Sequence, residues 1–352
     1  MKKLLIAGGI IILLFILFMV VIVFTPLLSE HGEPYSEDIN QTNRDRPDPE
    51  NRESVSIRVG SDIVKAWLYL PQHHQLPVPC VILSNGFGGI KDGLLEKFAL
   101  RYAKEGMASI NYDYRYFGES SGEPRQYYNK AAQLEDLKAV IAYARSRKEI
   151  HGKKIALFGT SGGGGYGLIE AANDKNISAV ISQCPALDEE ADEKNALRVH
   201  GIGHMLKLLI HAIRDKARSR FGLSPHLIPI FGPPGSFAVL TAPGAFDGFA
   251  RLIAAYPPSK PFQNRVTARF IVERQGFNPV DYADKVDCPV HFAICKFDNL
   301  VAPDSYKHIA EILGEKADIH VYPIGHFDIY LGEYFEKAVA NQITFLKKAF
   351  NY

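Results

Sequence analysis

The sequence contains little that would build a disulfide framework. Only four of its 352 residues are cysteine, and no two of them have the spacing of a CxxC motif. Cysteine is among the residue types most often buried, so we expect free thiols in or beside strands rather than disulfides. The four are Cys80, Cys184, Cys288 and Cys295.

The sequence also lacks a clear set of metal ligands and an excess of charge of either sign. His200 and His204 have the i, i+4 spacing of ligands on a helix, but no third ligand accompanies them in the sequence, so we predict no metal site. The 40 basic and 39 acidic residues leave a net charge of +1. Nucleic-acid-binding domains usually carry a basic excess, so we expect no nucleic-acid partner.

One long hydrophobic run lies at the N-terminus. Leu4 to Phe24 contains no charged residue, and about 20 apolar residues suffice to cross a bilayer as a helix. A cleaved signal peptide is the alternative, but its apolar region is usually shorter and ends in an Ala-x-Ala-like site. We therefore predict a transmembrane signal anchor over residues 1–28. Lys2 and Lys3 precede the run, which places the rest of the chain on the extracytoplasmic side.

Residues 29–52 are polar, charged and interrupted by prolines. Such a segment buries too little apolar surface to fold alone, so we predict a linker there and a globular domain over residues 53–352.

The centre of that domain is the stretch around Ser161. A short apolar strand at 155–158 is followed by Gly159-Thr160-Ser161-Gly162-Gly163 and then by a helical segment at 168–172. Strand, sharp G-x-S-x-G turn and helix form a nucleophile elbow. A phosphate-binding loop of the Walker type would need a Lys that is missing here, and a Rossmann glycine motif would follow the first strand.

Strands and helices alternate on both sides of this turn, which predicts an α/β fold with a mainly parallel, doubly wound sheet. Further strands are predicted at 55–59, 63–70, 78–83, 108–112, 177–182, 289–295 and 317–322, and helices at 94–104, 129–147, 304–313 and 333–350.

Asp298 and His326 follow two of these predicted strands. The carboxyl ends of parallel strands meet at one edge of a sheet, so we expect both side chains near Ser161. The chain order Ser161, Asp298, His326 then predicts a catalytic triad. Asp188, Asp304 and Asp328 are the competing candidates for the acid.

With these motifs the chain from residue 53 to residue 352 resembles the α/β-hydrolase superfamily. Within it, the chain resembles dienelactone-hydrolase-like and X-Pro-dipeptidyl-peptidase-like bacterial esterases, although dienelactone hydrolases use Cys where Ser161 stands. The resemblance implies an oxyanion hole formed by the backbone amides of Phe87 and Gly162, and no cofactor.

The alternation of strand and helix breaks between residues 186 and 287, which predicts an inserted helical cap over the site. A basic amphipathic helix is expected at 205–220. The cap also contains aromatic and aliphatic residues that would form either an acyl pocket or the core of the cap itself: Phe231, Phe237, Phe246, Phe249 and Leu252.

The predicted function is a membrane-anchored serine hydrolase of esters or related acyl compounds, acting through an acyl-enzyme on a small-molecule substrate. Peptidase, thioesterase and acyltransferase activities use the same triad, so the sequence does not separate them from an esterase. A non-catalytic binding role is a further alternative. The sequence does not indicate an oligomeric state.

Overall fold

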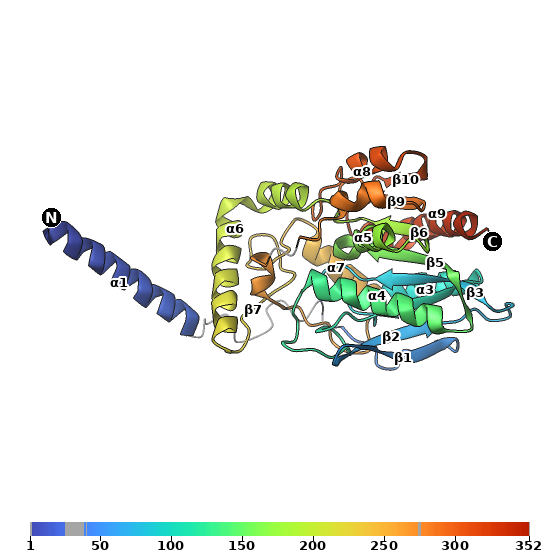
Figure 1. Cartoon of the computed structure of the whole chain (residues 1–352), viewed down its shortest axis with the longest axis horizontal. Helices are drawn as coiled ribbons and strands as arrows, with labels where there is room; N and C mark the ends of the chain where they lie inside the picture. Colours follow the sequence, from blue (N-terminus) through green and yellow to red (C-terminus); the bar gives the residue numbers. More distant parts are fainter. Residues whose placement is uncertain (1, 25–38, 40, 274–275, 352) are drawn as a thin grey trace.

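The computed structural model describes residues 2–24, 39, 41–273 and 276–351. Within these residues the main sheet has eight strands in the order β1-β2-β4-β3-β5-β6-β9-β10 (Figure 1). β1 and β2 pair antiparallel, as do β2 and β4, and the other neighbours are parallel. The strands are β1 (Arg52–Val59), β2 (Asp62–Tyr69), β3 (Val78–Ser84), β4 (Ala108–Tyr112), β5 (Ile150–Thr160), β6 (Ile177–Gln183), β9 (Val290–Cys295) and β10 (Ala317–Tyr322).

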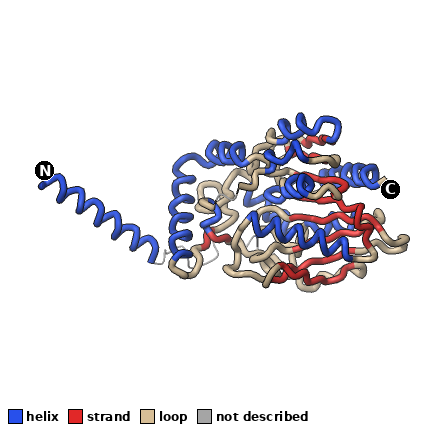
Figure 2. The backbone as a smooth tube through the Cα atoms, in the orientation of Figure 1, coloured by secondary structure: helices blue, strands red, loops and turns tan. Residues whose placement is uncertain are grey.

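Helices cover both faces of this sheet (Figure 2). α3 (Leu95–Lys104) and α9 (Gly332–Phe350) pack together on one face, and α4 (Lys130–Ser146) and α5 (Tyr166–Asn173) pack together on the other. The central strands β3, β4 and β9 are buried along their whole length, as expected of a parallel sheet covered on both sides. α8 (Tyr306–Leu313) connects β9 to β10. The predicted mainly parallel α/β architecture is thus confirmed.

The segment from residue 186 to residue 287, which we call the cap segment, departs from this alternation as predicted. Its first helix is longer than expected: α6 (Glu189–Arg220) begins 16 residues before the predicted 205–220, with Asp188 accepting hydrogen bonds from the first-turn amides. Gly201, at φ 76° and ψ 162°, bends α6 into two parts. The second part contains the predicted helix. The other elements are β7 (Leu227–Ile228), α7 (Ala245–Ala255), β8 (Val266–Thr267) and two 3₁₀ helices, Ala268–Ile271 and Pro279–Lys285.

α1 (Lys2–Phe24) projects from the end of the molecule at which the second half of α6 stands (Figure 1). Among the residues that the structure describes, no helix meets the length and hydropathy needed to cross a membrane. The predicted anchor at 1–28 and the predicted linker at 29–52 include residues outside the described set.

The last part of the predicted linker differs from the expectation, because it packs on the domain. The Arg46 guanidinium lies 2.8 Å from Asp92 and 3.1 Å from Glu96, and it stacks 4.5 Å from the ring centroid of Tyr256. The Asn43 amide donates to Pro258 O. A buried carboxylate needs a cationic partner. Glu96 is 0% exposed, and Arg46, in the segment that precedes β1, is one of its partners.

Candidate active site

Ser161 occupies a strained turn between β5 and α5. Its φ of 52° lies in the left-handed region, which a residue with a Cβ rarely adopts. A 3₁₀ turn over Ser161–Gly163 follows, and the regular helix begins only at Tyr166. The turn lifts the side chain beyond the carboxyl end of the sheet, as the predicted nucleophile elbow requires.

Two positions of this turn must be glycine because neighbouring backbone atoms lie too close to them for a Cβ. A Cβ on Gly159 would lie 2.2 Å from the Gly163 carbonyl oxygen, and one on Gly163 would lie 2.3 Å from Asn85 O. Both distances are far inside van der Waals contact, so no other residue fits without moving the main chain.

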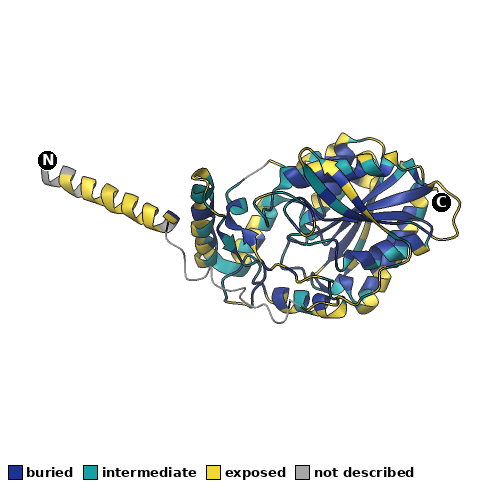
Figure 3. Ribbon diagram, turned by 90° about the horizontal axis from the view of Figure 1, so that it is seen from below, coloured by how far each residue is buried: buried dark blue, intermediate teal, exposed yellow. Residues whose placement is uncertain are grey.

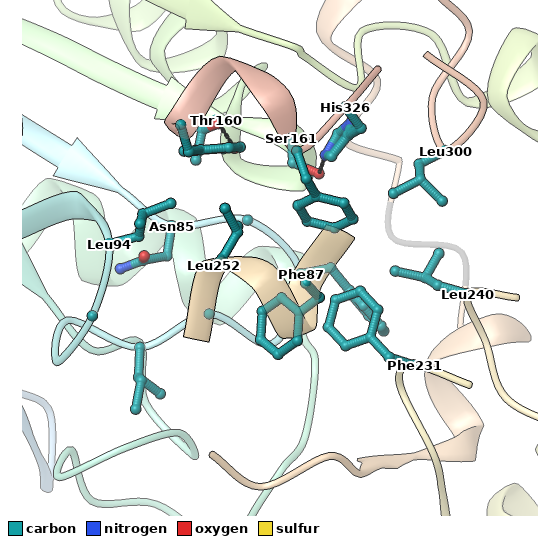
Figure 4. Close-up of a pocket in the computed structure, with 18 of the residues that line it drawn as sticks. Asn85, Phe87, Leu94, Thr160, Ser161, Phe231, Leu240, Leu252, Leu300 and His326 are labelled. Carbon is teal, nitrogen blue, oxygen red and sulfur yellow. Dashed lines mark hydrogen bonds between the residues drawn. The ribbon is translucent and has the colours of Figure 1, made fainter. Parts of the chain in front are cut away.

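The structure brings the three predicted triad residues together. His326 Nε2 lies 3.0 Å from Ser161 Oγ, and His326 Nδ1 lies 2.6 Å from Asp298 Oδ2 (Figure 4 shows the Ser161–His326 pair). The other carboxylate oxygen of Asp298 accepts the amides of Leu300 and Val301. The backbone therefore fixes the carboxylate, and the carboxylate fixes the imidazole.

The competing carboxylates are engaged elsewhere. Asp188 caps α6 through its own side chain. Asp304 pairs with Lys307, and Asp328 accepts the Gly325 amide and pairs with Arg251.

Two opposing effects act on His326. Burial lowers the pKa of its imidazole, whereas the Asp298 carboxylate raises it, and the net direction is well above the ordinary value. The carboxylate therefore stabilises the imidazolium, the form that results when this histidine takes up a proton.

The predicted oxyanion-hole amides lie on two facing loops. A Cβ on Gly162 would lie 3.4 Å from the Phe87 nitrogen, and one on Gly86 would lie 2.9 Å from Ser161 Cβ, so the two loops are in close contact. Among the described residues, none accepts a hydrogen bond from the Phe87 amide. The amides of Phe87 and Gly162 are thus placed beside Ser161, where an oxygen could be bound between them.

A cavity of about 370 Å³ opens above these residues (Figure 4). Its wall is predominantly apolar and comes from both the sheet edge and the cap segment. Of the five cap residues singled out in the sequence, three line the cavity: Phe231, Phe249 and Leu252. Phe231 and Phe249 stack at 4.1 Å between ring centroids. Phe237 instead packs on His211, so the cap aromatics divide between pocket wall and cap core.

Several groups around the site were not predicted from the sequence. Cys184 Sγ lies 3.9 Å from His326 Nε2 and 3.4 Å from Tyr330 Oη. Tyr128 lines the cavity and its ring meets Phe87 edge-on at 4.7 Å. Asp192, also on the wall, accepts the Ala302 amide, and burial raises its pKa to about 7. Only contacts between distant segments distinguish these residues, so no local motif signals them.

Within the described residues, one group could supply three metal ligands: His291, Asp318 and His320. None of them lines the cavity. His200 and His204, considered in the sequence, stack on each other at 5.0 Å, and His200 contacts Thr241.

Comparisons with known proteins show what the whole chain is similar to. Residues 60–222 match the family X-Pro dipeptidyl-peptidase (S15 family). The quorum-quenching protein AidA of Acinetobacter baumannii is 38% identical over 298 residues, covering 84% of this chain and 94% of AidA. The crystal structure of the α/β hydrolase GrgF from Penicillium superposes with a TM-score of 0.70 at 23% identity, over 86% of this chain and 99% of GrgF. Est1E from Butyrivibrio proteoclasticus, solved with ferulic acid, gives 0.57 at 17% identity, over 85% of this chain and all of Est1E.

Proposed function

Because this chain belongs to the α/β-hydrolases, we propose that it is a serine hydrolase of esters or related acyl compounds. The observation that carries the proposal is the chain of contacts from Ser161 Oγ through the His326 imidazole to Asp298. A serine alone is a weak nucleophile, and an adjacent, oriented base activates it.

The proposed reaction has two halves. Ser161 Oγ attacks the carbonyl carbon while His326 Nε2 takes the hydroxyl proton, and the amides of Phe87 and Gly162 hold the oxyanion. The tetrahedral intermediate collapses, the leaving group departs with the proton from His326, and an acyl-enzyme remains. Water, deprotonated by the same imidazole, then releases the acid and regenerates Ser161.

The apolar wall formed by Phe87, Phe231 and Phe249 favours a small-molecule substrate with an apolar acyl or aryl group. Two relatives are named polyketide transferase and thiohydrolase. They support acyl transfer and thioester cleavage as the second candidate class of reaction for this site. Product analysis with and without an added alcohol acceptor separates transfer from hydrolysis.

We also propose that the N-terminal segment anchors the chain in a membrane with the hydrolase domain on the extracytoplasmic side. The support is the uncharged run from Leu4 to Phe24, preceded by two lysines.

A fluorophosphonate probe with the full chain and an ester series tests the reaction. We expect stoichiometric labelling that Ser161→Ala abolishes, together with a fall in ester turnover of about 10⁴-fold or more. Ser54→Ala, at an exposed serine on β1, is the matched control and should label normally. Near-normal turnover by Ser161→Ala would contradict the mechanism, and a folded chain that never labels would favour a binding role.

A further inference from the structure

The second half of α6 carries an apolar stripe on its outer face. Five aliphatic residues spaced at positions 0, 4, 7, 8 and 11 lie on one side of the helix, whereas Leu208 and Ala212 are buried on the other. The five are between 38% and 65% exposed. We call them the outer stripe: Ile202, Leu206, Leu209, Ile210 and Ile213. A surface helix normally turns polar residues outward, so a contiguous apolar face of this kind indicates a contact surface.

The charge at the edges of the stripe is positive. No acidic residue occurs from position 202 to position 214, and Asp215 is buried in contact with Arg269. Lys207 and Arg220 are exposed on the same half of the helix. An apolar face with a basic rim matches an anionic lipid surface, where aliphatic side chains enter the interface and cations meet the headgroups.

The C-terminal end of the same helix contacts α1. The Phe24 ring packs 5.7 Å from the Phe221 ring, at the junction of the two helices, and Arg218 donates to Val23 O. Most described residues of α1 are exposed and apolar (Figure 3). In Figure 1 the second half of α6 stands at the end of the molecule from which α1 leaves, and its axis is oblique to that of α1.

We propose that the outer stripe of α6 docks on the surface of an anionic lipid bilayer. The inference rests on the proposed anchoring by the N-terminal segment and goes beyond it, because it gives the cap segment its own lipid contact. A second copy of the chain would cover the stripe but leave the adjoining face of α1 exposed. A bilayer covers both.

Quenching by brominated lipid tests this contact in the full chain. The single native tryptophan, Trp67, is buried and supplies a constant background. Leu206→Trp and Ile210→Trp place a reporter in the stripe. Ile312→Trp is the matched control, because Ile312 on α8 is similarly exposed, at 42%. Each variant is reconstituted in vesicles of phosphatidylcholine and phosphatidylglycerol, with bromine on the acyl chains near the headgroup.

We expect the emission of both stripe variants to shift to shorter wavelength and to be quenched by the brominated lipid, while that of Ile312→Trp stays unquenched. A chain that floats with the vesicles but shows no quenching in either stripe variant would overturn the docking and leave the anchor intact. A shift that depends on protein concentration without lipid quenching would assign the stripe to a second copy, which also overturns it. A chain that does not float would refute the anchor and the docking together, whereas the labelling of Ser161 is independent of all three outcomes.

Discussion

The floor and the roof of the cavity are built by different means. The floor is made of the loops at residues 84–89 and 159–163. At Gly159 and Gly163 backbone atoms approach so closely that a methyl group has no room. The roof, contributed by the cap segment, consists of side chains such as Phe231 and Phe249 that pack ring on ring. The comparison indicates that the position of Ser161 is fixed by the main chain around it, whereas the shape of the cavity can change by exchange of side chains.

The largest expected effect comes from adding one methyl group to the floor, compared with adding one at an exposed position of the cap segment. Gly163→Ala places its Cβ against Asn85 O at 2.3 Å, and we expect a loss of about 3 kcal/mol in the free energy of unfolding, together with most activity. Gly203→Ala, in α6, meets nothing within 4 Å and should gain up to about 1 kcal/mol from helix propensity. Chemical denaturation of both variants measures the two effects, and equal destabilisation would refute the distinction.

A second test removes a charge that connects the sheet domain to the cap segment. Glu96 is fully buried on α3, and its carboxylate accepts from Tyr69, Arg52 and Tyr256, the last at the end of α7. Glu96→Gln leaves two arginines with an incomplete partner, so we expect a loss of about 3 kcal/mol in stability. Glu333→Gln, at an exposed carboxylate paired with Lys337, is the control and should leave the denaturation midpoint unchanged. If both variants unfold like the parent, the buried carboxylate does not hold the two regions together.

A smaller change is expected from the roof alone. Phe249→Ala enlarges the pocket without touching the elbow, so kcat/KM for the preferred ester should fall roughly 10-fold while labelling of Ser161 persists. Phe237→Ala removes an aromatic ring of the cap that does not line the cavity and should leave the ranking of acyl chain lengths as it was. The measurement is the hydrolysis rate of each variant over a series of esters with different acyl chain lengths. An unchanged ranking in Phe249→Ala would mean that this ring is not part of the substrate surface.

The smallest effect concerns Asp192 on the wall of the cavity. Its pKa of about 7 lies above the value of an unfolded chain, so the folded state holds a proton that the unfolded state has lost at about pH 6. Stability therefore falls as pH rises through this window, by about 1 kcal/mol between pH 6 and pH 8. Asp192→Asn keeps an acceptor for the Ala302 amide and lacks this titration. Parallel pH profiles of the parent and the variant would show that Asp192 does not titrate there.

Much of the fold follows from local patterns, as the strand predicted and found at 317–322 illustrates. The elbow could also be predicted, since a strand, five specified residues and a helix are contiguous in the chain. Asp136 on α4 shows the limit: Arg115 binds it at 2.6 Å and it is fully buried, and no local pattern in the sequence indicates this contact. The start of α6 was missed because Gly201 and Gly203 interrupt the helical pattern, although Gly201 only bends the helix.

The pairing of Arg46 with Glu96 has a mechanical consequence. A pull on the chain just ahead of residue 43 reaches the contacts of residues 43–46 before it reaches β1. The same carboxylate accepts from Tyr256, and the Arg46 side chain donates to Pro257 O, next to it in the cap segment. A pull on the N-terminal segment is thus transmitted to the cover of the cavity before it strains the sheet.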